Sequence, residues 1–76
     1  MDIRAAFGKV LKQARQEKNF SQETLAFEMD VERSYISKLE IGMYQPRLST
    51  ILLAAKVLDI RASVLVDRVE ELMEQE

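Results

Sequence analysis

The chain of 76 residues contains no cysteine and no histidine. It therefore lacks disulfides, thiolate nucleophiles, imidazole bases and the usual zinc ligands. The carboxylates, lysines and hydroxyls that remain form no convergent set at a spacing typical of catalysis. We therefore expect no enzyme, no metal site and no cofactor. The absence of cysteine also suits a reducing compartment, so we expect a cytoplasmic protein.

Long apolar runs are absent as well. The longest, residues 51–55, is far shorter than the roughly 18–20 residues that span a bilayer. The first ten residues, MDIRAAFGKV, have no apolar core of the kind that a secretory signal needs. Hydrophobic residues make up 47% of the chain and charged residues 32%. These values predict one globular domain over residues 1–76, without a membrane segment.

The formal net charge of −2 is unevenly distributed. Residues 1–58 carry nine Lys and Arg against seven Asp and Glu, whereas residues 59–76 carry two against six. The acidic residues are therefore concentrated in the C-terminal part, and the part before it is mildly basic. Binding in a nucleic-acid groove requires only a local basic face, so the net charge does not exclude it.

The spacing of apolar residues predicts five helices, at about residues 3–18, 22–29, 33–41, 49–58 and 62–74. Asp2 and Ser21 are suitable N-caps for the first two. Asn19 and Gly42 are suitable exits for the first and third, and Asp30 tolerates the left-handed turn after the second. No segment of the sequence shows a pattern that predicts a β-strand, so the chain is expected to be all-α.

Glycine inside a helix costs about 1 kcal/mol relative to alanine, so Gly8 predicts a close packing contact in the first helix. The fourth helix is apolar nearly all round. A helix without a polar face is covered on more than one side, which predicts the core on one side and a partner on the other.

Residues 21–42, SQETLAFEMDVERSYISKLEIG, predict two short helices joined by a tight turn. At about 100° per residue, Ile36, Leu39 and Glu40 share one side of the second helix. The opposite arc is rich in polar groups and consists of Arg33, Ser34, Ser37, Lys38 and Ile41. This layout is typical of a helix-turn-helix, whose second helix enters the DNA major groove.

Three phrases at matching spacing carry a family resemblance: SQETLA, SYISKLEIG and PRLSTILLAAKVLDI. They resemble the lambda-repressor-like helix-turn-helix family over about residues 7–66. Within it, SQETLAF and ERSYIS look like controller proteins of restriction–modification systems. The resemblance implies a compact five-helix domain that acts as a homodimer on near-palindromic double-stranded DNA. It also implies a sequence-specific transcriptional regulator such as a repressor, with activation equally open.

The resemblance also implies contacts for individual residues. Gln22 would contact a phosphate or a base edge, and the helix at 33–41 would read the sequence through Arg33, Ser34, Ser37 and Lys38. Arg15 and Glu40 would form a buried ion pair, which agrees with the inward position of Glu40. Three residues depart from the usual pattern: Asp30 and Asp59 replace glycines, and Glu32 replaces the serine that caps the reading helix.

The residue types support these roles. Arg33 has the fork geometry for two hydrogen bonds to guanine, and Lys38 can read a base or hold a phosphate. Ser34 and Ser37 can bond a base or the DNA backbone, or remain solvated. Tyr35 can touch a phosphate or a thymine methyl, or pack against the preceding helix. Arg47, in the loop after Pro46, is expected to meet a phosphate.

A dimer interface is predicted on the fourth helix and on the C-terminal helix at about 62–74. The residues expected there are Leu53, Val57, Leu65 and Val69. Phe27 points away from the apolar side of its helix and is expected to be partly covered beside the first helix, with contact to a partner as the alternative. The alternative is an antitoxin or co-regulator that chiefly binds a protein. No small-molecule ligand is expected.

Overall fold

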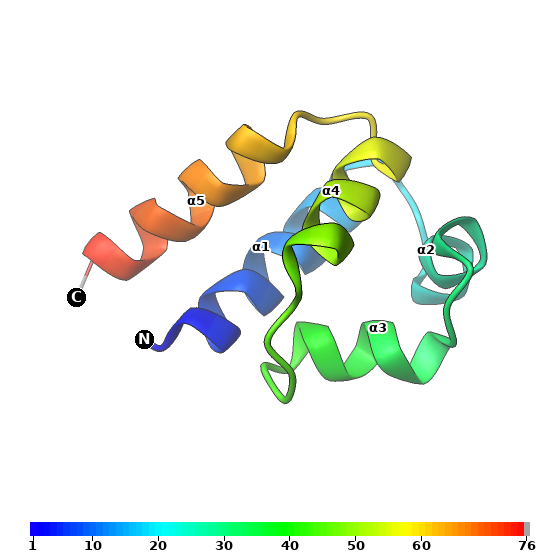
Figure 1. Cartoon of the computed structure of the whole chain (residues 1–76), viewed down its shortest axis with the longest axis horizontal. Helices are drawn as coiled ribbons and strands as arrows, with labels where there is room; N and C mark the ends of the chain where they lie inside the picture. The colour runs from blue at the N-terminus through cyan, green and yellow to red at the C-terminus, as the bar shows by residue number, and fades with distance from the viewer. Residues whose placement is uncertain (76) are drawn as a thin grey trace.

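Five α-helices make up the computed structural model, which describes residues 1–75 and has no strand in that range (Figure 1). They are α1 (Ile3–Glu17), α2 (Gln22–Met29), α3 (Arg33–Glu40), α4 (Leu48–Val57) and α5 (Ala62–Glu74). The Cα radius of gyration is 11.2 Å. The predicted all-α fold is confirmed. Within the described range, no helix has both the length and the apolar character needed to cross a membrane.

The helix starts follow from capping by short polar side chains. The Asp2 carboxylate accepts a hydrogen bond from the Ala5 N–H at 2.9 Å, and the Ser21 hydroxyl accepts one from the Thr24 N–H at 3.0 Å. Each bond satisfies a donor that the first helical turn leaves unpaired. The Ala5 N–H also lowers the pKa of Asp2, because it stabilises the ionised carboxylate.

The helix ends follow from residues in the left-handed region. Asn19, Asp30 and Asp59 have φ values of 62°, 57° and 54°, and Gly42 has 80°. The expected exits at Asn19, Asp30 and Gly42 are therefore present, and the two aspartates that replace glycines adopt the glycine-type conformation. The predicted helix bounds differ from the observed ones by one residue at four ends. The chain is already leaving the helix at Lys18, Ile41 and Leu58, and α4 begins at Leu48, one residue before its predicted start.

The core lies where α1 packs against both α3 and α5, while α2 packs on α3 and α4 (Figure 1). The buried apolar side chains are Ala6, Phe7, Val10, Leu11, Ala14, Leu25, Ala26, Met29, Ile36, Leu39, Ala54, Ala55, Leu58, Leu65 and Val69. The side of α1 that carries Ala6, Val10 and Ala14 is buried, whereas Ile3, in the first turn of the same helix, is 47% exposed. The core therefore fixes α3 from beneath and leaves its outer face uncovered.

Gly8 occupies the closest approach between α1 and α3. A Cβ atom built there would lie 2.5 Å from the Glu40 carbonyl oxygen and 2.6 Å from that of Leu39. No real side chain is accommodated at such distances from backbone atoms, so the expected close packing contact is present. Glycine lets the C-terminal end of α3 rest directly on α1.

Candidate nucleic-acid interface

The turn between α2 and α3 sets the angle at which α3 leaves the domain. Asp30 is left-handed, and the Val31 N–H donates to the Ala26 carbonyl at 2.9 Å. Val31 is half-buried and packs on the core. Glu32 then begins α3, and its side chain makes no cap hydrogen bond to any residue of the described range. The two helices are thus joined by three residues and form a rigid pair over the core.

The two faces of α3 have opposite environments. Ile36 and Leu39 are fully buried, as expected. Arg33 and Ser34 are exposed on the opposite side. Three further side chains of the predicted reading face are half-buried: Tyr35, Ser37 and Lys38. The structure therefore brings the predicted reading residues of α3 together on one accessible face.

A groove of about 750 Å³ lies between this face and the start of α4. Its lining includes Glu32, Ser34, Tyr35, Lys38, Tyr44, Gln45, Arg47, Ser49 and Thr50. The rings of Tyr35 and Tyr44 have centroids 6.0 Å apart, and the Lys38 Nζ lies 5.8 Å from the Tyr44 centroid. Such contacts limit where the Lys38 ammonium can move. The polar groups of the lining are hydroxyls, the Gln45 amide, the cations of Lys38 and Arg47, and the carboxylate of Glu32.

Arg47 stands at the helical end of this groove. It is the N-cap of α4, and its side chain forms no cap bond within residues 1–75. The first N–H groups of a helix have no partner in the helix itself, and the N-terminal end carries a partial positive charge. The cation and this helix end together make one end of the groove attractive to anions.

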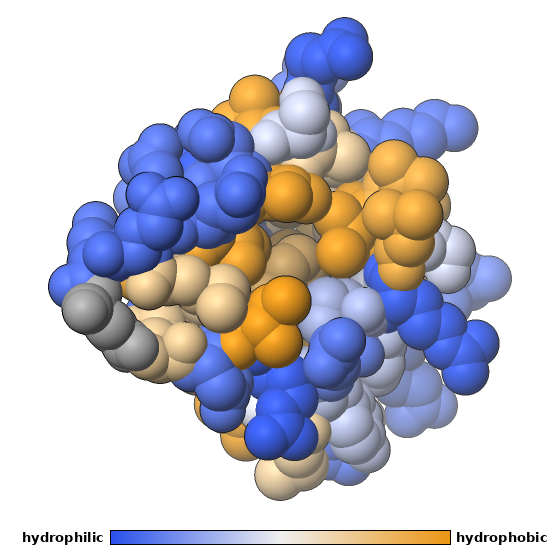
Figure 2. Space-filling model, turned by 60° about the vertical axis from the view of Figure 1, so that its left-hand side comes forward, coloured by the Kyte–Doolittle hydropathy of each residue, from blue (hydrophilic) through white to orange (hydrophobic). Residues whose placement is uncertain are grey.

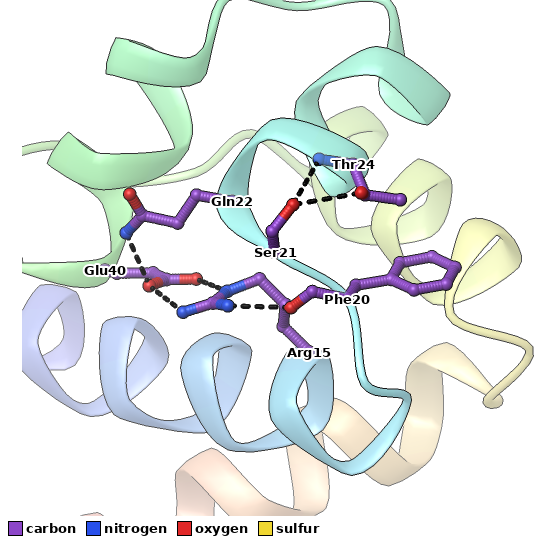
Figure 3. A network of polar contacts seen from close by, with 6 residues as sticks. All are labelled: Arg15, Phe20, Ser21, Gln22, Thr24 and Glu40. Atoms are coloured by element: carbon purple, nitrogen blue, oxygen red, sulfur yellow. Dashed lines mark hydrogen bonds and ion pairs between the residues drawn. The ribbon is translucent and has the colours of Figure 1, made fainter.

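A buried ion pair between Arg15 and Glu40 links the C-terminal ends of α1 and α3 (Figure 3). Arg15 donates from Nε to Glu40 Oε2 at 2.7 Å and from Nη2 to Glu40 Oε1 at 3.0 Å. Its Nη1 donates to the Phe20 carbonyl at 2.8 Å. One guanidinium therefore links the end of α1, the segment entering α2 and the end of α3. The ion pair expected between Arg15 and Glu40 is present.

Gln22 begins α2 next to this pair and is half-buried. Its Nε2 donates to Glu40 Oε1 at 3.0 Å. The sequence predicts Gln22 as a surface contact, and its bond to Glu40 is an additional role that its position in the chain does not reveal. The three side chains come from α1, α2 and α3 and form one network (Figure 3).

The sequence and the fold have counterparts among known proteins. The helix-turn-helix family matches residues 11–65. The protein belongs to this family. The control protein C.BamHI of Bacillus amyloliquefaciens is 42% identical over 67 residues, which are 87% of this chain and 83% of that protein. The chain is a helix-turn-helix DNA-binding regulator of the controller type, and the predicted family is confirmed.

Solved structures of similar proteins share the architecture. The crystal structure of the restriction–modification controller protein C.AhdI from Aeromonas hydrophila is 41% identical, with a TM-score of 0.77 over 80% of this chain and 92% of that one. The clp gene regulator ClgR from Corynebacterium glutamicum reaches a TM-score of 0.94 over 99% of this chain and 80% of its own. At 21% identity, ClgR shows the fold alone.

Two of the residues predicted for a dimer interface are corrected by the structure of this helix-turn-helix protein. Leu65 is 0% exposed and Val69 is 8% exposed, because both pack into the protomer core. They offer almost no surface to a second chain. Leu53 is 39% exposed and Val57 is half-buried, so these two retain a surface that a partner can contact.

Exposed apolar side chains gather elsewhere on α4 and α5. Leu48, Leu52 and Val66 are 68%, 53% and 43% exposed. Nearby, a hollow of about 210 Å³ is lined by Ile3, Phe7, Gln45, Pro46, Ile51, Val66 and Val69. Figure 2 shows hydrophobic residues around such a hollow in the middle of one face. Within residues 1–75, Gln45 is the one polar side chain in the lining of this hollow, whereas the α3 groove has several polar and charged side chains.

Sequence reasoning missed Tyr44 and misplaced Phe27. Tyr44 lies in the loop that Gly42 and Pro46 predict, but nothing in that loop signals its contact with Lys38 across the turn. Phe27 is 82% exposed rather than partly covered beside α1, because α1 contacts α3 and α5 instead. The i, i+3 and i, i+4 pattern identifies the outward direction of Phe27 but not how far its neighbours extend.

Proposed function

We propose that this controller-type protein binds a near-palindromic DNA operator as a homodimer, with α3 of each protomer in a major groove. The observation that carries the proposal is the accessible polar face of α3 opposite the fully buried Ile36 and Leu39. A helix that packs on the core with one face and leaves the opposite face accessible can insert into a DNA groove. Half-sites are then expected about 34 Å apart, one helical turn of DNA.

Arg33 and Arg47 have different roles in this proposal. Arg33 is exposed at the first turn of α3, the part of a recognition helix that contacts base edges. Arg47 lies at the positive end of α4 beside the groove and is placed for a phosphate. The remaining contacts are proposed for Gln22, Ser34, Tyr35, Ser37 and Lys38.

Selection of bound duplexes from random DNA tests the proposal. We expect a motif with two related half-sites. Arg33→Ala should relax the preference at one base pair in each half-site, because a bidentate arginine–guanine pair discriminates by about 1–3 kcal/mol. Arg47→Ala should weaken binding to all sequences and reduce the slope of log affinity against log salt by about 0.9. If no motif is enriched, the proposed function is wrong.

The apolar face of α4 and α5 supports the homodimer. It exposes Leu48, Leu52, Leu53 and Val66 on one small domain, and such a surface is typically covered by a partner. Light scattering tests this step. A monomer would instead favour a module that binds another protein.

Leu52→Asp should weaken the dimer at least about tenfold, because burial of a leucine stabilises an interface by about 1.5–3 kcal/mol. Phe27→Asp is the matched control, since Phe27 is more exposed but lies on α2. An equal loss of dimer in both variants would contradict the placement of the interface on α4 and α5.

A further inference from the structure

The side-chain amide of Gln22 is held by the ion pair rather than left to rotate. Its Nε2 donates to Glu40 Oε1 at 3.0 Å, and the Nη2 of Arg15 donates to the same oxygen at 3.0 Å (Figure 3). The Glu40 side chain is only 3% exposed. Its carboxylate is thus held in one position, and the hydrogen bond to it restricts the rotation of the Gln22 amide.

The bond leaves half of the Gln22 donor capacity unused. An amide nitrogen carries two N–H groups, and only one is directed at Glu40. Because that bond selects which way the amide is turned, the second N–H has a defined direction. Without the carboxylate, the amide can rotate and present its oxygen instead, which repels a phosphate.

We propose that Glu40 is a positioning residue for DNA binding, which turns the Gln22 amide so that its second N–H donates to a DNA phosphate. Arg15 acts through Glu40, because it holds both carboxylate oxygens and balances their charge. The ion pair therefore contributes to affinity as well as to the fold. This inference rests on the proposed function, since it concerns a contact to the same ligand.

The orientation can be measured without DNA. In proton-exchange NMR of the native protein, one Nε2 proton of Gln22 should exchange with solvent more slowly than those of Gln13 and Gln16. Both comparison glutamines are exposed on α1. Equal exchange for all three side chains would show that Glu40 does not hold the amide, and would overturn the proposal.

The coupling to DNA is measured with a mixed-sequence duplex at low salt, because phosphate contacts do not depend on sequence. Gln22→Met should weaken binding about tenfold in the native background, as expected for a hydrogen bond to a charged group. Gln13→Met, on the exposed side of α1, is the matched control and should leave affinity unchanged.

The same Gln22→Met change is then made in a background where Arg15→Met and Glu40→Met replace the pair together. Replacing both partners avoids a buried unpaired charge, and circular dichroism checks that the background is folded. There the loss should fall to about twofold or less. If the ion pair were purely structural, Gln22→Met would reduce DNA affinity by the same factor in both backgrounds, and that result would overturn the proposal. An unchanged affinity of Gln22→Met in the native background would overturn it as well.

The two proposals fail in different ways. If random DNA yields no motif but the mixed-sequence duplex still shows the coupling, the operator proposal fails and the positioning role stands. If the native protein binds no duplex at all, both fail as statements about DNA, whatever the amide exchange shows.

Discussion

Replacing Gly8 with alanine sets helix propensity against packing. Alanine favours an α-helix over glycine by about 1 kcal/mol, so propensity alone predicts a more stable protein. The added Cβ, however, would lie 2.5 Å from the Glu40 carbonyl oxygen, 2.6 Å from that of Leu39 and 2.9 Å from the Glu40 carbonyl carbon. All three are backbone atoms of α3, so no flexible side chain can move aside.

The packing cost should exceed the gain in propensity. Inserting one carbon into a well-packed site typically costs about 1–3 kcal/mol, and values at or above the upper end apply where backbone must shift. Subtracting the gain of about 1 kcal/mol from the upper end of that range, about 3 kcal/mol, leaves a net loss of roughly 2 kcal/mol. A domain of this size has a stability of only about 4–11 kcal/mol, so the loss is a large share of it.

Urea denaturation followed by circular dichroism measures the effect. With a slope near 1 kcal/mol per molar urea, a loss of roughly 2 kcal/mol should lower the midpoint by about 2 M. Lys12→Ala is the control, because Lys12 is exposed on the same helix and reports propensity without the contact with α3. A Gly8→Ala protein that is about 1 kcal/mol more stable than the native one would refute the reasoning.

Three other substitutions test the polar groups. Arg15→Met alone should cost about 3–5 kcal/mol in chemical denaturation because it leaves Glu40 buried without its partner, whereas Arg15→Met with Glu40→Met should cost far less. The pKa of Asp2 is lowered by the Ala5 N–H, so its contribution to stability is present above the ordinary pKa and is lost as the pH falls through the folded-state value. Asp2→Ser should therefore reduce the acid-induced loss of stability seen by thermal melting as the pH falls below about 4. Glu32→Ser should supply the missing N-cap of α3, worth about 1 kcal/mol in thermal unfolding, and should strengthen binding to a mixed-sequence duplex by removing a negative charge from the groove. A weaker duplex complex with Glu32→Ser would count against DNA in that groove.

The sequence predicted the five helices because their signals are local. Ser21 and Asp2 cap helices through bonds that span three residues, and Asn19, Asp30 and Gly42 end them through their own backbone conformation. The apolar side of α3 was also predictable, since the 3.6-residue repeat places Ile36 and Leu39 together. The same repeat also places the polar residues Arg33 and Ser34 on the opposite, exposed arc of α3.

The rest depended on contacts between distant segments. Periodicity places Leu65 and Val69 on the apolar side of α5, but it does not distinguish a side that packs on its own α1 from one that packs on a second chain. The bond from Gln22 to Glu40 spans 18 residues and joins α2 to α3, and the close approach of α3 to α1 at Gly8 is likewise a contact between distant segments. Such distances result from the assembled core rather than from any local pattern.

The distribution of charge explains how a protein with a net charge of −2 can suit a polyanionic partner. The acidic residues after position 58 lie mostly on α5, which packs on α1 and α4 (Figure 1). The groove lies instead between α3 and the start of α4. The molecule is 34 Å long, and exposed charges are largely screened beyond about 8 Å at physiological salt. A phosphate in the groove is therefore affected chiefly by Lys38, Arg47 and Glu32. The net charge of the chain should govern its solubility and its encounter rate at low salt, while these few local groups govern whether a bound duplex stays.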